Sequence, residues 1–304
     1  MATSLSQIRH LLEPGLYGVT GKYKDIPSKW ASIFTKKKST LTVERSVSTR
    51  FLPLPVLKTE GAAAYTDNNA GTRYQYNAET QEVSLGYAMT RKVLDDNLYK
   101  SEFMPQNLGL QRVFAQYKEI SAANILNNAT TYDQNIGGDG KALCATDHPV
   151  DGSTYANKPS TEMGLNEASL LAALTTIRTT WVDEANVRVF ARGKQVIVPP
   201  ALAPVIHRLI HADLRPGTTS NDPNVIKSMD GGLEKGYVVM DFLSSSYAWF
   251  IQTNIDGLIY FEKVPFETSM WTDDATDNLN VKGYERYVFV HNEPRCMWGT
   301  FPTS

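Results

Sequence analysis

Two strand-like stretches joined by a long run of small polar residues constrain this chain more than any other feature. Apolar and polar residues alternate over 41–45, an apolar run follows at 51–57, and a second alternating stretch lies at 82–90. Residues 58–80 between them are mostly small and polar. The pattern predicts a long β-hairpin with a loose tip. Because an isolated two-stranded hairpin is only marginally stable in water, we expect contacts from another subunit to complete it.

Pro53 and Pro55 lie inside the apolar run of this hairpin. Proline has no N–H to donate to a strand ladder, so two prolines in one run favour an edge strand or a projecting ribbon. Before the hairpin, Ser6 is a candidate cap of a short helix that Pro14 and Gly15 would end. The residues that follow, to about position 40, have no sustained hydrophobic period and are interpreted as an extended arm.

A long amphipathic helix is predicted over 104–129. Its apolar residues recur at helical spacing, and they are Leu110, Val113, Phe114, Tyr117 and Ile120. At about 1.5 Å per residue, this helix would span about 39 Å, which suits a structural spine.

The rest of the chain places helices first and strands later. Asn166 is a plausible cap for a second helix, with Leu170, Leu174, Ile177 and Trp181 on one face. Pro199 and Pro200 open a third helix after a buried strand at 196–198. Strands are predicted at 237–240, 248–253, 258–264 and 281–290, with turns at 256–257 and 273–280. The segregation of helices and strands indicates the α+β class.

The composition excludes several classes of protein. The chain has 304 residues, of which 42% are hydrophobic and 20% charged, so it can bury enough apolar surface to fold. No stretch reaches the roughly 18 apolar residues that a membrane span needs, and the first 14 residues lack the pattern of a secretory signal. We therefore expect a soluble protein made in a cytoplasm. Its two cysteines, Cys144 and Cys296, are too few to hold a fold together by disulfides.

The formal net charge of −2 conceals an asymmetry. Residues 1–60 carry ten basic and four acidic side chains, a net charge of +6, and the remainder carries −8. A basic arm ahead of an acidic body fits contact with a polyanion or with an acidic neighbouring surface, and a solvated, mobile N-terminal segment is the competing interpretation.

Motifs that carry chemistry are weak throughout. Residues 15–22 approach a phosphate-binding P-loop, but the glycine spacing is wrong and Tyr23 stands where Ser or Thr should bind magnesium. His207 and His211 share a helical face without the glutamate of a zinc hydrolase, so we interpret them as surface or partly packed histidines. The glycine-rich stretch 137–140 lacks the ligands of a calcium loop, and the acidic residues of 273–277 are interpreted as a solvated turn.

Cys144 and His148 are the remaining candidates for a nucleophile and a base. Both lie in one short loop, whereas cysteine hydrolases bring these residues together from distant positions. A small buried thiol and a loop histidine are the favoured interpretation. We expect no catalytic residue, no cofactor-binding residue, no metal ligand and no cofactor, and therefore no enzyme.

The order of segments resembles the major capsid protein of tailed bacteriophages, which has the Hong Kong 97-type fold. Local sequence is similar to the Mu-like head-subunit family. The residues that carry the resemblance are 139–143 (DGKAL), 147–149 (DHP), 197–200 (IVPP) with Leu202, 249–250 (WF), 256–261 (DGLIYF) and the final stretch 282–290. Cys144 stands where that family's loop would have an aromatic residue.

The resemblance implies a division of the chain. Residues 1–40 would form the N-terminal arm and 41–90 the extended hairpin loop. Residues 91–184 would form a peripheral domain with the spine helix at 104–129. Residues 185–255 would form an axial domain at the five-fold and six-fold centres, and 256–304 would return to the peripheral domain.

The function implied is a capsid subunit that assembles into hexamers and pentamers of an icosahedral head around double-stranded DNA. Implied partners are further copies of the chain, a separate scaffolding protein, a portal and a decoration or cement protein, with non-specific DNA contact and no membrane. The location would be the virion, and the host cytoplasm during assembly. The alternatives are an encapsulin-like nanocompartment shell and a Cys144-dependent hydrolase.

A covalent cross-link between subunits is a further hypothesis. In some members of this fold, a hairpin lysine joins a neighbour's asparagine with a glutamate as catalyst. Lys58 and Glu60 lie near the hairpin, but the reaction needs a desolvated lysine beside a poised carboxylate.

Overall fold

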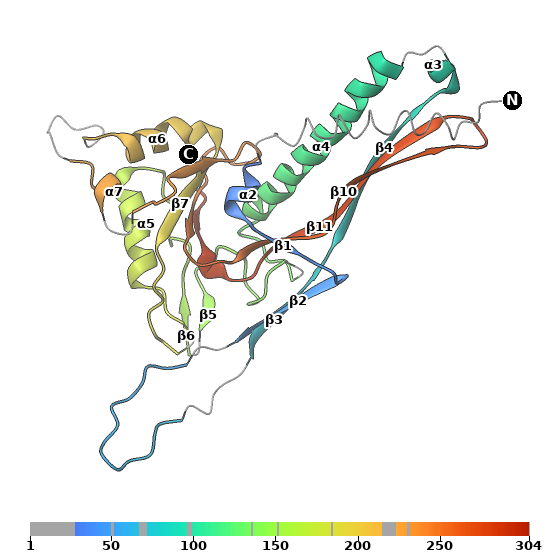
Figure 1. Cartoon of the computed structure of the whole chain (residues 1–304). Coiled ribbons are helices and arrows are strands. Elements are labelled where there is room, and N and C mark those ends of the chain that lie inside the picture. The colour runs from blue at the N-terminus through green and yellow to red at the C-terminus, as the bar shows by residue number, and fades with distance from the viewer. Residues whose placement is uncertain are drawn as a thin grey trace.

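The computed structural model describes residues 28–49, 52–66, 72–95, 99–134, 136–150, 152–183, 185–214, 223–229 and 232–303. The expected helix after Ser6 and the P-loop-like residues 15–22 lie outside this part of the chain. Figure 1 shows a body of two sheets with helices, a long helix that extends to one side together with long strands of one sheet, and a loop projecting below. None of the described helices is both long enough and apolar enough to cross a membrane.

The first sheet has the strand order β1-β10-β11-β4. These strands are β1 (Thr35–Lys38), β10 (Leu258–Thr272), β11 (Leu279–His291) and β4 (Gln81–Met89). β1 runs parallel to β10, and the other neighbouring strands are antiparallel. The β10–β11 register shifts on both sides of Val264, beside Pro265, where a residue without an N–H interrupts the ladder.

The predicted spine helix is confirmed as α4 (Tyr99–Asn127), which begins five residues earlier than expected and follows a short helix, α3 (Arg91–Asp95). Leu110, Phe114 and Leu126 are buried, whereas Val113 and Tyr117 are about half exposed. The predicted apolar face was therefore too wide, because only part of it meets the sheet.

Gly283 lets α4 approach β11 closely. A Cβ atom built on this glycine would lie 2.9 Å from the rings of both Phe114 and Phe266, too close for any larger residue. These two rings pack edge to face, with centroids 4.9 Å apart.

The second sheet has the order β12-β9-β7-β8. It consists of β12 (Met297–Thr300), β9 (Trp249–Thr253), β7 (Gly193–Val198) and β8 (Tyr237–Val239). Around it lie α5 (Glu167–Thr179), the 3-10 turn η1 (Pro200–Leu202), α6 (Ala203–His211) and α7 (Val225–Ser228). The predicted strands at 196–198, 237–240 and 248–253 are confirmed within one to three residues.

Asn166 caps α5 as predicted. Its side-chain oxygen accepts a hydrogen bond from the Ser169 N–H, and the Ser169 hydroxyl oxygen accepts one from the Asn166 N–H. Leu170, Leu174 and Ile177 form the buried face of the helix. The predicted helix after Pro199 begins as η1 and continues as α6.

The hairpin differs from the prediction. β2 (Val43–Thr49) pairs with β3 (Thr72–Glu79), whereas the 82–90 stretch forms β4 and joins the first sheet beside β11. The apolar run at 51–57 is not a strand in its described part, residues 52–57, because its prolines cannot donate to a ladder. A two-stranded hairpin, β5 (His148–Val150) and β6 (Ser153–Tyr155), follows in the loop-rich region.

One core joins the two sheets. Trp30 of the short helix α2 (Trp30–Ile33) and Phe34 directly after it pack with Phe289 of the first sheet. The same cluster includes Ile197 and Phe250 of the second sheet. The last strand, β12, pairs with β9, so the C-terminal stretch contributes strands to both sheets. The short turn η2 (Pro294–Cys296) makes this crossing.

Candidate assembly surfaces

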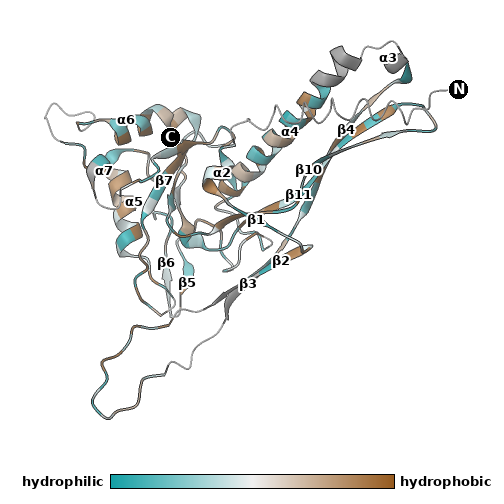
Figure 2. Cartoon of the chain, in the orientation of Figure 1, coloured by the Kyte–Doolittle hydropathy of each residue, from teal (hydrophilic) through white to brown (hydrophobic). Residues whose placement is uncertain are grey.

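The loop 52–66 projects from the hairpin without helix or strand (Figure 1). Its large apolar side chains are mostly exposed: Leu52 by 69%, Leu54 by 66%, Val56 by 67%, Leu57 by 98% and Tyr65 by 68%. Hydrophobic and hydrophilic stretches both occur along this isolated length of chain (Figure 2). Each such side chain that becomes buried stabilises a complex by about 1.5–3 kcal/mol before ordering costs, so the loop has the chemistry of a docking segment.

The base of the loop is anchored to the first sheet. Tyr76 and Ala78 of β3 are fully buried in a cluster with Ile259 and Phe261 of β10 and with Val288 and Val290 of β11. The anchored base holds the hairpin in place, while Pro53 and Pro55 favour an extended backbone beyond it. The structure therefore fixes where the loop leaves the body and leaves its apolar side chains without partners in the described part of this chain.

Lys58 and Glu60 are both exposed in this loop. The desolvation that a cross-linking lysine needs is not supplied by the described part of the chain around it. A neighbouring subunit would have to provide it, so the cross-link stays a hypothesis.

The described part of the basic arm is partly neutralised by the body. Lys29 forms an ion pair with Asp241 at 2.6 Å, and Lys36 forms one with Glu262 at 2.8 Å. Lys37 and Lys38 are exposed on β1, which is an edge strand of the first sheet. Lysines on an edge strand oppose the addition of a further strand and leave a small basic surface.

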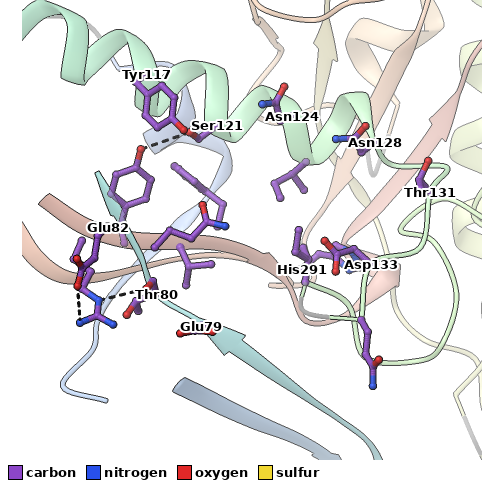
Figure 3. Close-up of a pocket in the computed structure, with 18 of the residues that line it drawn as sticks. Glu79, Thr80, Glu82, Tyr117, Ser121, Asn124, Asn128, Thr131, Asp133 and His291 are labelled. Carbon is purple, nitrogen blue, oxygen red and sulfur yellow. Dashed lines mark hydrogen bonds and ion pairs between the residues drawn. The ribbon is translucent and has the colours of Figure 1, made fainter. Parts of the chain in front are cut away.

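A groove of ≈ 1190 Å³ lies between α4, β11 and the β3–β4 junction (Figure 3). Its lining combines the polar side chains of Ser121, Asn124 and Asn128, on α4 and directly after it, with apolar residues and the carboxylates of Glu79, Glu82 and Asp133. Burial lowers the pKa of His291, which also lines it, to about 4, so this imidazole is neutral at neutral pH. This mixture is typical of a contact surface between proteins and not of a catalytic pocket, which gathers a few convergent groups.

A buried polar network fixes the loop that carries the DGKAL and DHP motifs. The Asn157 amide nitrogen donates to the carbonyl oxygens of Leu143, Pro294 and Met297 at 2.6–3.1 Å. Its oxygen accepts from the Ala145 N–H and lies 3.0 Å from His148 Nε2. Asn157 therefore ties this loop to the segment that enters β12.

His148 is held on both sides. Its Nδ1 lies 2.5 Å from Asp139 Oδ2, and both side chains are fully buried. Because the Asn157 nitrogen is committed as a donor, the Asn157 oxygen must be the acceptor for His148 Nε2. Both imidazole nitrogens are thus occupied by structural partners.

Cys144 and His148 do not form a nucleophile and base. Cys144 is buried in the core, and burial raises the pKa of its thiol, which disfavours the reactive thiolate. The imidazole has no nitrogen available for it. The hypothesis of a Cys144-dependent hydrolase is therefore contradicted by this geometry. The interpretation of Cys144 as a small buried thiol is confirmed.

The other motifs lie apart from this network. His207 and His211 are exposed on α6, as expected for surface histidines. The 273–277 stretch is a turn in which Asp273 accepts from the Ala275 N–H and the Thr276 hydroxyl, and Asp277 pairs with Arg91. Among the described residues, no group of three or more His, Cys, Asp or Glu side chains is arranged to hold a metal.

Two buried features were not predicted from the sequence. No local sequence pattern marks Asn157 as the centre of a hydrogen-bond network, because its partners lie 9 to 140 residues away along the chain. The ion pair between Lys118 of α4 and the buried Glu285 of β11, at 2.5 Å, was also missed. The sequence signal for this ion pair is Glu285, a charged residue at a position of β11 where the alternating pattern expects an apolar one.

Comparison with known proteins identifies the family. Residues 74–299 match the family model described as "Phage capsid protein". No curated protein matches the sequence.

Solved structures share the fold at low identity. The capsid of an empty GTA particle matches with a TM-score of 0.55 and 13% identity, over 90% of this chain and 89% of that one. The mature capsid of bacteriophage PhiM1 matches with a TM-score of 0.55 and 10% identity, over 91% and 88%. A virus-like particle from Pyrococcus furiosus matches with a TM-score of 0.52 and 10% identity, over 94% and 95%.

The capsid of bacteriophage JBD30 matches with a TM-score of 0.51 and 13% identity. It covers 91% of this chain, which spans only 66% of the length of that protein. The predicted α+β, Hong Kong 97-type fold is confirmed by these matches. Since the family model extends from the hairpin strand β3 to the last strand β12, the chain belongs to the phage capsid protein family.

Proposed function

We propose that this chain is the major capsid subunit of a phage head, and that copies of it assemble into hexamers and pentamers of a closed icosahedral shell around double-stranded DNA. The observation that carries the proposal is the projecting loop 52–66, whose five large apolar side chains are exposed on a chain of a capsid family. A repeating shell provides each subunit with neighbours that bury such a loop.

The hairpin region 41–90 is the proposed contact arm. A stable pair of proteins buries about 1,600 Å² in total, and a loop of 15 residues together with its hairpin supplies a large part of one such interface. Each subunit repeats the contact around the shell, so modest individual interfaces become hard to dissociate together.

The proposed domains follow the two sheets. Residues 91–184, with α4, belong mainly to the peripheral domain, and 185–255, with β7, β8 and β9, belong to the axial domain at the five-fold and six-fold centres. Residues 256–304 return to the peripheral domain through β10 and β11. Because β12 pairs with β9, the proposal assigns the last strand to the axial sheet.

The proposed partners are a separate scaffolding protein, a portal and a decoration or cement protein. The basic side chains of residues 1–60 are proposed to contact packaged DNA through phosphates, without sequence preference. The protein would be a component of the virion and would assemble in the host cytoplasm.

Negative-stain microscopy and light scattering of the purified full-length chain test the function. Rings of five or six subunits, or closed shells of variable size, are the expected result. A protein that stays monomeric at high concentration, in the presence of its co-expressed phage proteins, would overturn the proposal.

The content of purified shells separates phage head from nanocompartment. Nucleic acid inside particles from infected cells supports the head, whereas a protein cargo without nucleic acid supports an encapsulin-like shell. Uniform shells formed efficiently by this chain alone would contradict a separate scaffolding protein.

A further inference from the structure

Two histidines on the outer face of α6 lie close enough to act together. Ile206, Leu209 and Ile210 are the buried side of this helix, so His207 and His211, four residues apart, share the exposed side. Their ring centroids are 4.6 Å apart, and the ring planes are tilted by 45°. The capsid function does not account for this pair.

The spacing of the rings matches that of two imidazoles on one metal ion. Metal–nitrogen bonds to histidine are about 2.0–2.1 Å long, which places the centres of two rings on one ion roughly 4.5–5 Å apart at bond angles of about 90–110°. The separation in α6 falls in this range without rearrangement of the helix. Exposure leaves the remaining coordination positions open to water or to a ligand from another molecule.

Tyr237 of β8 holds one of the rings. Its hydroxyl lies 3.2 Å from His207 Nδ1, and its ring lies 6.1 Å and 6.3 Å from the two histidine rings. Metal-binding histidines commonly donate their other ring N–H to a fixed acceptor, which sets the tautomer and presents the second nitrogen to the metal. With His207 in its Nδ1–H tautomer, the tyrosine oxygen is such an acceptor, and Nε2 is the nitrogen left for the metal.

We propose that His207 and His211 bind a divalent transition metal of the copper, nickel or zinc type through their ring nitrogens, with Tyr237 as a positioning residue for His207. Imidazole favours these ions over magnesium and calcium, which prefer oxygen ligands. The site lies within one chain, so it does not depend on the proposed assembly.

Competing sites are few among the described residues. His148 and His291 are buried, and so are the thiols of Cys144 and Cys296. His10 lies outside the described part of the chain and requires its own control.

Calorimetric titration of the full-length, tag-free chain with CuCl₂, NiCl₂, ZnCl₂ and MgCl₂ tests the site. We expect one ion per chain, with Cu²⁺ bound more tightly than Ni²⁺ or Zn²⁺ and no saturable Mg²⁺ binding. His207→Gln and His211→Gln should each weaken binding by roughly tenfold or more, because each leaves a single imidazole without its chelating partner. Tyr237→Phe should weaken it by about tenfold at unchanged stoichiometry.

Two variants serve as matched controls. Arg208→Gln changes an exposed residue of the same helix, and His10→Gln removes the histidine outside the described residues; both should leave the titration unchanged. Circular dichroism establishes that each variant is folded. Absence of saturable binding, or binding that survives His207→Gln and His211→Gln, would overturn the metal site, and full affinity in Tyr237→Phe would overturn the role of Tyr237.

Discussion

The core around the second sheet and the projecting loop 52–66 both contain large apolar side chains. In the core these side chains are buried, and in the loop they are exposed to solvent. Trp181, Trp249 and Trp298 are at most 2% exposed, and the indoles of the first two also donate to backbone carbonyls. Leu57 is 98% exposed. Burial within the chain stabilises the first region, whereas the second gains the same stabilisation only from another molecule. The fold of one subunit and the assembly of many are thus encoded in separate segments, and substitutions can separate them.

The largest effect on subunit stability is expected at Asn157. Asn157→Leu keeps the branched shape but removes the hydrogen-bond partner that three carbonyls, the Ala145 N–H and His148 Nε2 share in the interior. We expect the free energy of unfolding of the unassembled subunit to fall by about 4–5 kcal/mol, measured by urea denaturation. Asn128→Ala, at an exposed position of the same residue type, should change it by less than about 0.5 kcal/mol. A loss for Asn157→Leu as small as that of the control would show that the network does not hold the loop.

The next effect is expected where α4 meets β11. Lys118→Met leaves the buried Glu285 carboxylate without its ion-pair partner, and we expect a loss of about 3 kcal/mol at neutral pH. Glu285→Gln in the same background removes the charge and should recover part of this loss. If the double variant is no more stable than Lys118→Met alone, the unpaired Glu285 carboxylate is not the cause of the lost stability.

The loss in Lys118→Met should depend on pH. Burial raises the pKa of Glu285 above its ordinary value of 4.5, although the Lys118 ammonium lowers it. A group whose pKa is raised in the folded state stabilises the fold below its ordinary pKa, and this contribution is lost as the pH rises through the raised value. Removing Lys118 raises the pKa further, so the deficit relative to the parent should shrink from neutral pH toward pH 4.5. An equal deficit at both pH values would contradict this assignment.

Elements with a local cause were predicted from the sequence, and elements set by distant partners were not. The α5 cap at Asn166 and the proline-started η1 and α6 depend on residues within one turn, so their signals are visible in the sequence. Both 41–45 and 82–90 have the alternating pattern of a strand. That pattern does not show that 82–90, as β4, pairs with β11, which lies nearly 200 residues further along the chain. The hub at Asn157 and the half-exposed face of α4 are likewise decided by packing.

A smaller effect is expected at the α5 cap. Asn166→Ala removes the acceptor for the Ser169 N–H, and we expect a loss of about 1 kcal/mol in the free energy of unfolding. Asn166→Asp retains an acceptor oxygen and should stay within about 0.5 kcal/mol of the parent. Equal losses in both variants would indicate that the amide group, and not the cap, is what matters.

The smallest effect on the subunit, and the largest on assembly, is expected in the loop 52–66. Leu57→Asp and Leu54→Asp replace exposed side chains, so the free energy of unfolding of the subunit should change by less than about 0.5 kcal/mol. In an interface, each carboxylate would be buried without a partner, and particle formation followed by light scattering should be lost. Thr59→Asp adds the same charge at an exposed polar position and should assemble nearly normally. Assembly that tolerates both leucine substitutions would mean that the loop stays in solvent within the shell, and the exposed leucines would then need another explanation than a neighbouring subunit.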